Sequence, residues 1–327
     1  MIKTYFYRDE EKKILHDIDL GRIEDYLSSP DDLLWVDLFH CDDLELNYIG
    51  KVFDFHPLAI EDCLQLSPRA KVDKYDKYYF FVFHALHYDE ESEDEEITTS
   101  ELDVFLGKNY IVTIHKRPLA AVGKIVKQCL SQSRLMDRGP DYLLYSIVDA
   151  IVDDYFPIAE RLGERIDDLE DEIYINPAEE VTDEILALKR TILLLRKVVL
   201  PQRRIFASVG GRYSFDVSPD NQPFYMDLAD HMERIADTTD TYRDLVNNVL
   251  DSFFSLTSNR TNEVIRVLTI ISTIMLPLTF ITGLFGMNVP LPLEGTIEFK
   301  YMFWVIVAAT ALLSWSMLRF FRKNKWI

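Results

Sequence analysis

Apolar and polar positions alternate with a helical period along the last third of the chain. Between Pro223 and Pro277 there is neither glycine nor proline, so no residue in this stretch interrupts a helix. In its first part, apolar residues recur in steps of three and four, and the charged residues fall between them. This pattern predicts a long helix whose seam packs against a second helix. The seam consists of Leu228, Met232, Ile235, Thr239, Tyr242, Val246, Val249, Phe253 and Leu256.

The pattern changes near residue 267, where the charged positions stop. Residues 267–285 contain no charged side chain, and a second uncharged run covers residues 301–318. Runs of about 18 apolar residues or more are typical of membrane spans. The connection between the runs is short and contains Pro290 and Pro292. We therefore expect a two-span transmembrane hairpin.

A basic segment follows the second uncharged run directly, with Arg319, Arg322, Lys323 and Lys325. Cations that flank a span mark its cytoplasmic end. Because two spans return the chain to the side from which it came, we expect both termini in the cytoplasm. The expected location is the plasma (inner) membrane, with the connecting loop outside.

The first uncharged run carries small and polar residues on one helical face. Ser272, Leu276, Thr279 and Gly283 recur in steps of four, three and four, which places them on the same side of a helix. Such residues can allow close helix packing, or they can face a water-filled path. An asparagine just beyond the end of the run, in the tripeptide at 286–288, favours the second interpretation.

The first part of the chain alternates short apolar runs with helical patterns. Apolar runs at 33–38, 78–84, 102–106 and 110–115 predict strands, and residues 43–55 predict a helix. Together they predict an α/β domain over residues 1–125.

Two longer helical patterns follow this domain. One runs from about residue 141 to 175, and the other from about 178 to 200. Asn176-Pro177 interrupts the helical pattern between them, and Pro201 is expected to end the second helix. The two helices should form an antiparallel hairpin within residues 126–222.

Composition narrows the classes of function. The chain of 327 residues has 35 Lys and Arg against 55 Asp and Glu, a net charge of −20, which would repel nucleic-acid phosphates. No glycine-rich phosphate loop or nucleophile elbow occurs. His84 and His87 are three apart on a predicted strand and so point to opposite faces, and the other histidines are interpreted as isolated. The sequence therefore predicts no enzyme.

Several carboxylates stand out by position. Glu61 and Asp62 end a short predicted helix that begins at Pro57, where the helix dipole disfavours anions. Asp149 lies among apolar residues, and Asp227 and Asp230 begin the long helix. From the sequence alone, each of the five is interpreted as a solvated charge.

The chain resembles the CorA-type divalent-cation channels. Their signature is an aromatic residue followed by Gly-Met-Asn at the end of the first of two C-terminal spans, and this chain has Phe285, Gly286, Met287 and Asn288 there. Pro-Leu-Thr-Phe at 277–280 lies in the first span, as in the family. The resemblance also extends to the segments at 56–62, 142–146 and 261–264.

The resemblance implies an α+β membrane protein that forms a funnel-shaped homopentamer in the lipid bilayer, with the first spans around a central pore. It also implies that the pentamer is a channel for Mg²⁺, with Co²⁺ and Ni²⁺ as further ions. With the patterns above it divides the chain as follows: a cytosolic α/β domain (1–125), a cytosolic helical hairpin (126–222), a stalk helix (223–266), a first span with the Gly-Met-Asn motif (267–288), an external loop (289–300), a second span (301–318) and a basic cytoplasmic tail (319–327).

The resemblance also implies roles for individual residues. A ring formed by Gly286, Met287 and Asn288 would select a cation that keeps its water shell, which suits Mg²⁺ because this ion dehydrates reluctantly. The apolar members of the pore wall are candidate constrictions. The residues implied for the pore wall are Asn262, Ile265, Leu268, Ser272, Leu276, Thr279 and Gly283.

The same resemblance implies a regulatory role for the five carboxylates. The implied ligands of cytosolic Mg²⁺ are Glu61, Asp62, Asp149, Asp227 and the more weakly placed Asp230, with Asp62 of one subunit facing Asp227 of the next. Opposed carboxylates repel each other unless a divalent cation lies between them. Bound Mg²⁺ would then hold the ring of subunits closed.

Two departures from the family pattern bear on the preferred ion. The aromatic residue of the signature is commonly tyrosine but is Phe285 here, and the outer loop lacks the family's Met-Pro-Glu-Leu segment. Glu294 and Glu298 in this loop are candidates for attracting cations. Two alternatives therefore stay open: a zinc transporter of the same fold, with Zn²⁺ or Co²⁺ as the bound metal, and a non-conducting membrane-anchored scaffold.

Overall fold

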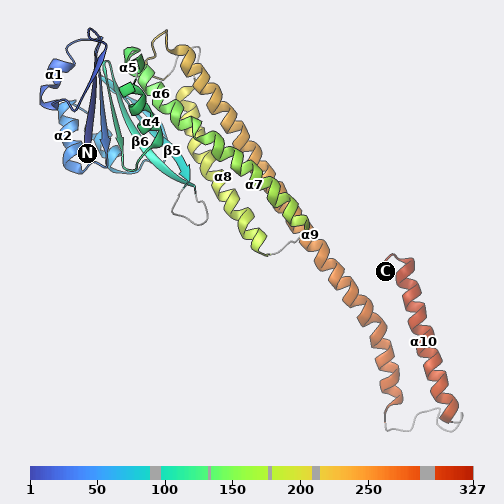
Figure 1. Cartoon of the computed structure of the whole chain (residues 1–327). Coiled ribbons are helices and arrows are strands. Elements are labelled where there is room, and N and C mark those ends of the chain that lie inside the picture. Colours follow the sequence, from blue (N-terminus) through green and yellow to red (C-terminus); the bar gives the residue numbers. More distant parts are fainter. Residues whose placement is uncertain (89–96, 132–133, 176–178, 208–213, 288–298, 327) are drawn as a thin grey trace. The chain divides into compact units, whose positions relative to one another are not determined.

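The computed structural model describes residues 1–88, 97–131, 134–175, 179–207, 214–287 and 299–326 (Figure 1). The chain divides into two compact units. The first consists of Met1–Glu172 and Ala178–Leu250, and the second of Ile173–Pro177 and Asp251–Ile327. The expected helix break at Asn176-Pro177 lies outside the described residues.

A mixed seven-stranded sheet with the order β2-β1-β3-β7-β6-β5-β4 forms the centre of the first unit. β3 and β7 pair in parallel, and every other pair is antiparallel. All four strands predicted from apolar runs are present, whereas β1, β2 and β4 were not predicted. The strands are β1 (Ile2–Arg8), β2 (Lys13–His16), β3 (Leu33–Phe39), β4 (Lys71–Lys74), β5 (Tyr78–Tyr88), β6 (Ile97–Gly107) and β7 (Tyr110–His115).

Helices cover both faces of this sheet, which explains why its central strands are mainly apolar. On one face, α2 (Asp43–Val52) and α3 (Pro57–Leu64) share a buried core with alternate residues of β3 and with Phe105. The other face carries α4 (Ala120–Ser131) and α6 (Pro140–Asp153) (Figure 1). The short elements of this unit are η1 (Leu20–Arg22), α1 (Ile23–Tyr26) and α5 (Arg134–Asp137).

The expected helical hairpin is present, with two differences. The first helical stretch is divided at Asp154 into α6 and α7 (Tyr155–Ile175). The second helix, α8 (Glu179–Phe206), does not end at Pro201, so that prediction is wrong. Helix α8 continues because Gln202 is fully buried and donates hydrogen bonds from Nε2 to the Tyr155 hydroxyl and the Val198 carbonyl. Such anchoring outweighs the cost of a proline inside a helix, about 3 kcal/mol.

Helix α9 (Gln222–Phe285) is the long helix predicted from the seam, and it continues through Pro277. Within the first unit, its seam is buried from Leu228 to Val249, with Tyr242 partly buried. Tyr242 lies against Gly163 of α7, where even a single added methyl group would stand 2.5 Å from the tyrosine hydroxyl. The seam therefore packs against a partner helix of the same chain.

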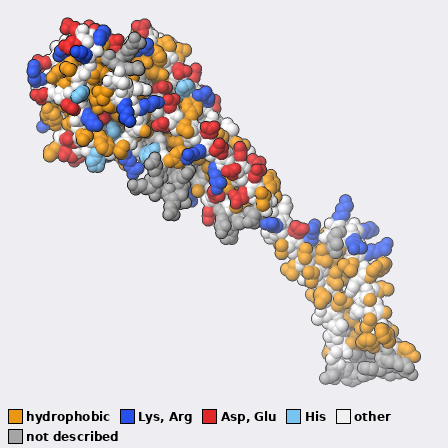
Figure 2. Space-filling model, viewed as in Figure 1, with side chains coloured by type: hydrophobic (Ala, Val, Ile, Leu, Met, Phe, Trp, Pro, Cys, Tyr) orange, Lys and Arg blue, Asp and Glu red, His pale blue; other side chains and the backbone are white. Residues whose placement is uncertain are grey.

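The second unit contains the end of α9 and helix α10 (Phe299–Lys323). Both helices are long and apolar enough to cross a membrane. Figure 2 shows hydrophobic side chains over these helices and Lys and Arg side chains at the C-terminal end of α10. The two predicted spans are thus exposed apolar helices with a basic end.

Candidate metal-binding and conduction sites

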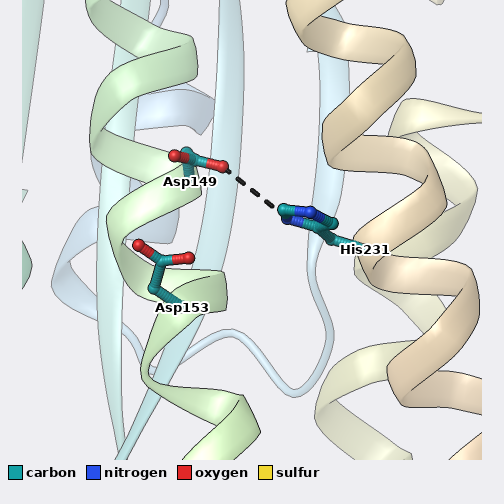
Figure 3. Close-up of side chains that lie close together, drawn as sticks. All are labelled: Asp149, Asp153 and His231. Atoms are coloured by element: carbon teal, nitrogen blue, oxygen red, sulfur yellow. Dashed lines mark ion pairs between the residues drawn. The ribbon is translucent and has the colours of Figure 1, made fainter.

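Helices α6 and α9 bring two of the predicted carboxylates around one histidine. Asp149 lies on α6, and its Oδ1 is 4.0 Å from Nδ1 of His231 on α9 (Figure 3). The other ring nitrogen of His231, Nε2, is 3.8 Å from Oδ2 of Asp227, one helical turn earlier on α9. Asp149 and Asp227, distant in sequence, therefore meet through His231.

Asp153 completes this cluster from the next turn of α6. One ligand atom from each of Asp149, Asp153 and His231 lies within 4.8 Å of the others, and the three side chains point into the same space (Figure 3). Carboxylate oxygens suit Mg²⁺, whereas an imidazole suits Co²⁺, Ni²⁺ or Zn²⁺. The cluster of Asp149, Asp153, Asp227 and His231, called the α6–α9 cluster below, has the chemistry of a divalent-cation site.

The polar atoms inside this cluster are incompletely satisfied. Oδ1 of Asp149 and Nδ1 of His231 are both buried, and neither has a hydrogen-bond partner among the described residues. Burial, followed by the nearby Asp153 carboxylate, raises the pKa of Asp149. A cation would lower that pKa again because it stabilises the charged carboxylate. The cluster therefore favours binding of positive charge.

Glu61 and Asp62 lie elsewhere in the same chain. Both are in the last turn of α3, which begins at Pro57 as predicted. Oδ2 of Asp62 is 2.7 Å from Nζ of Lys71, and Glu61 is exposed. No ion pair or hydrogen bond within the described residues joins either of them to the α6–α9 cluster.

Asp230 is exposed on α9 and lines a shallow hollow on the same helix. Glu233 and Asp237 line the hollow too, and Arg234 is its one cation among the described lining residues. This position is separate from the space between Asp149 and His231. Asp230 therefore does not belong to the α6–α9 cluster.

The predicted pore-wall residues all lie on α9 and are exposed in the single chain. Ile265, Leu268 and Leu276 are 55%, 62% and 70% exposed, respectively. The Thr279 hydroxyl donates to the Met275 carbonyl at 2.9 Å, and an added Cβ at Gly283 would meet nothing within 4 Å. This face of α9 therefore has no partner within the described chain. Asn262 and Ser272 are exposed as well.

The signature tripeptide lies at the end of the described part of α9. The Gly286 amide donates to the Thr282 carbonyl at 2.9 Å, and the Met287 amide donates to the Leu284 carbonyl at 3.4 Å. The helix thus ends within the signature. Asn288, Glu294 and Glu298 lie outside the described residues.

The sequence interpretation missed two members of the α6–α9 cluster. His231 was interpreted as an isolated histidine, but it lies between two carboxylates, so that interpretation is wrong. The available signal was its spacing of four from Asp227, and Asp153 has the same spacing from Asp149. His84 and His87 have different partners: His84 contacts the Ser67 carbonyl, and His87 contacts the Thr98 hydroxyl.

Comparisons with known proteins bear on the family to which this chain belongs. A family model described as CorA-like Mg²⁺ transporter protein matches residues 30–323. The cobalt/magnesium transport protein CorA of Thermotoga maritima is 35% identical over 281 residues, 85% of this chain and 79% of that protein. The zinc transport protein ZntB of Pectobacterium atrosepticum is 25% identical over 185 residues, 57% of this chain and 56% of that protein.

A solved structure has the same fold over the whole length. The CorA magnesium transporter from Methanocaldococcus jannaschii superimposes with a TM-score of 0.82 at 24% identity, covering 100% of this chain and 99% of that chain. At this identity the match establishes the fold. With the family match and the relative from T. maritima, it leads to one conclusion: the chain belongs to the CorA-like Mg²⁺ transporter family and is a divalent-cation transport protein of the membrane.

Proposed function

We propose that this transporter is a magnesium channel that also passes Co²⁺ and Ni²⁺, and that Gly286, Met287 and Asn288 select the hydrated ion. The observation that carries the proposal is the signature itself, at the end of the uncharged part of α9. The name of the T. maritima relative, a cobalt/magnesium transport protein, agrees with it. Neutral amide oxygens can hydrogen-bond to the water shell of Mg²⁺ without stripping it.

The proposed pore follows from the unpartnered face of α9. Asn262, Ser272, Thr279 and Gly283 would line the path, and Ile265, Leu268 and Leu276 would form apolar constrictions. A polar stripe between apolar positions is costly in lipid unless it faces protein or water. Association of several copies around this face, in a homopentamer, would remove that cost.

The proposed topology places the first unit and both termini in the cytoplasm, at the plasma membrane. The basic end of α10 supports this orientation. The stalk helix, the spans and the external loop keep the boundaries expected from the sequence. Glu294 and Glu298 in that loop would raise the local cation concentration at the entrance.

We also propose that cytosolic Mg²⁺ regulates the channel. Asp149 and Asp227 would bind it in the α6–α9 cluster, with Asp153 and His231 as additional ligands, and Glu61 and Asp62 would approach from the neighbouring subunit. Within the described chain, Asp62 pairs with Lys71 and not with the cluster, which fits a site shared between subunits. Asp230 is a less favoured ligand because it lies in the hollow on α9.

Metal flux into liposomes that carry the purified protein tests the proposed selectivity. Entry of Mg²⁺, Co²⁺ and Zn²⁺ would be compared for the parent, Asn288→Ala and the control Asn324→Ala. We expect saturable Mg²⁺ entry that falls at least about tenfold, or loses selectivity, in Asn288→Ala, which corresponds to about 1.4 kcal/mol. The control lies after the last span and should behave as the parent does.

The same experiment distinguishes a magnesium channel from a zinc transporter of the same fold. Zn²⁺ entry without Mg²⁺ entry would overturn the magnesium proposal and would group the chain with the zinc-transporting relative. Equal Mg²⁺ entry and unchanged selectivity in the parent and Asn288→Ala would remove the ring of Asn288 from the mechanism. An assembled protein that passes none of the three metals would favour the scaffold alternative.

A further inference from the structure

A groove of about 580 Å³ lies between α8 and β4, on the first unit and away from the α6–α9 cluster. Its size is within the range of small-molecule sites, about 300–1,000 Å³. Residues from the segment before β4, from β4 itself and from one side of α8 line it. Ser214 completes the described lining.

The charge of this groove is opposite to that of the chain. Five of the lining residues are Lys or Arg, and none of the described lining residues is acidic, although the whole chain has a net charge of −20. Like charges placed together destabilise the folded state unless something compensates them. A cluster of five Lys and Arg side chains in an acidic protein therefore suggests that this groove binds an anion.

Among the described residues, carboxylates form ion pairs with two of these five basic side chains. Nζ of Lys71 is 2.7 Å from carboxylate oxygens of both Asp62 and Asp73, and Nε of Arg196 is 2.7 Å from Oδ1 of Asp240.

The other three cations of the groove are Arg69, Lys197 and Arg204. They are exposed, and the ion pairs within the described chain include none of them. Three positively charged side chains, whose N–H groups form no ion pair within the described chain, therefore line the same groove.

The remaining lining residues are mainly apolar. Val72, Leu200 and Pro201 are partly buried, and Leu193 is 45% exposed beside them. Arginine binds phosphate through two parallel hydrogen bonds, and lysine adds a point charge. An inorganic anion would pair with the Lys and Arg side chains and leave the apolar wall exposed to water. A phosphate-bearing ligand with an apolar or aromatic portion would use both.

We propose that the groove between α8 and β4 binds a nucleoside polyphosphate, with Arg69, Lys197 and Arg204 on the phosphates and the apolar wall against the base. This inference does not depend on which metal the protein transports. Lys71 connects the groove with α3 because it also contacts Asp62.

Isothermal titration calorimetry on the full-length protein in detergent tests the proposal. The probe is ATP in metal-free buffer at about 150 mM salt, where weak surface attraction is screened. We expect saturable binding at one site per chain that weakens at least tenfold when Lys197→Gln and Arg204→Gln are combined. The matched control is Lys127→Gln, an exposed lysine on α4, which should leave the affinity unchanged.

Two further probes separate the parts of the ligand. Tripolyphosphate should bind at least tenfold more weakly than ATP, and adenosine should not bind measurably. Equal affinity for ATP and tripolyphosphate would overturn the role of the apolar wall. Absence of ATP binding to the parent, or equal loss in the control variant, would overturn the site. Size-exclusion profiles of the parent and the variants show whether each variant still assembles. The single variant Arg69→Gln should assemble as the parent does and bind ATP more weakly.

Discussion

A buried carboxyl pair on β6 illustrates what individual residues contribute. Asp103 is 3% exposed, and its Oδ1 has no hydrogen-bond partner within the described chain. Glu101, on the same face of the strand, accepts a hydrogen bond from the Ser67 amide at 2.7 Å. Burial raises the pKa of Glu101 to about 7 and the pKa of Asp103 well above its usual value.

Other charged groups face this pair from each neighbouring element. His84, opposite Glu101 on β5, lies 3.7 Å from its carboxylate. Cys63 and Asp62 approach from α3, and Lys116 approaches from the end of β7. None of these contacts offsets the burial, so protons stay on the pair at pH values where solvated carboxylates are ionised.

This pair should make the folded state less stable as the pH rises. A carboxyl with a raised pKa holds its proton in the folded state and releases it on unfolding. The contribution of Glu101 to folding stability is therefore fully present below about pH 4.5 and is lost as the pH rises through about 7. We expect Asp103→Asn to remove part of that loss. Between about pH 5 and pH 8 the parent should lose about 1–3 kcal/mol more than the variant, which corresponds to several degrees in Tm.

Thermal unfolding of the full-length protein in detergent at both pH values measures this difference. Other buried groups titrate in the same range, so the quantity of interest is the parent minus the variant. Asp76→Asn is a suitable control because Asp76 is exposed. Parallel curves for the parent and Asp103→Asn would contradict the assignment of the pH dependence to this pair.

At the same scale, the sequence indicated part of the candidate site. Asp149 and Asp227 were selected through a family resemblance, and the structure places both beside His231. The spacing of the histidines alone does not reveal His231, because its neighbours in the cluster are carboxylates. Whether Asp149 and Asp227 lie close depends on how α6 packs on α9, and no local pattern contains that information.

At the scale of elements, apolar runs predicted the central strands and failed at the edges. β7 is buried along its whole length and β3 is buried up to Leu38, so their sequences are mainly apolar. β4 has the sequence KVDK and pairs only with β5 at the edge of the sheet. Its pairing, rather than its composition, makes it a strand. Pro201 shows the same effect in a helix. The burial of Gln202 keeps α8 helical although proline disfavours a helix at this position.

Two glycines in helices provide a test of the packing between α7 and α9. A Cβ at Gly163 would stand 2.5 Å from the Tyr242 hydroxyl, whereas a Cβ at Gly123 on α4 would meet nothing within 4 Å. We expect Gly163→Ala to destabilise the protein by about 1–3 kcal/mol, because overpacking exceeds the gain in helix propensity. Gly123→Ala should stabilise it by about 0.5–1 kcal/mol.

The midpoint of thermal unfolding, measured by circular dichroism on the full-length protein, distinguishes the two variants. Opposite shifts are the expected result. If both variants shifted the midpoint upward by similar amounts, α7 and α9 would not be in the close contact that Gly163 permits.

At the scale of the whole molecule, the two units contribute different parts of the proposed function. The first unit carries the carboxylates and the sheet, and the second carries the exposed apolar helices. In the described chain, the face of α9 that carries Ile265, Leu268 and Leu276 is exposed. Asp62 pairs with Lys71 rather than with Asp227. Both observations favour an assembly of several copies.

The regulatory proposal makes its sharpest prediction at this scale, at Asp227. Its side chain is 61% exposed beside His231, so a lysine there would place a positive charge where a bound cation is proposed. If Mg²⁺ closes the channel by cancelling repulsion between carboxylates, Asp227→Lys should resemble the Mg²⁺-bound state. We expect flux in this variant to depend on internal Mg²⁺ at least fivefold less steeply than in the parent.

Liposomes loaded with a series of internal Mg²⁺ concentrations measure this dependence, and Asp251→Lys provides the same charge change at an exposed position of α9 outside the cluster. The control should keep the response of the parent. A ligand can shift the populations of two states only by the difference in its affinity for them. An unchanged Mg²⁺ response in Asp227→Lys would therefore mean that this carboxylate does not distinguish open from closed channels, and regulation would have to lie outside the α6–α9 cluster.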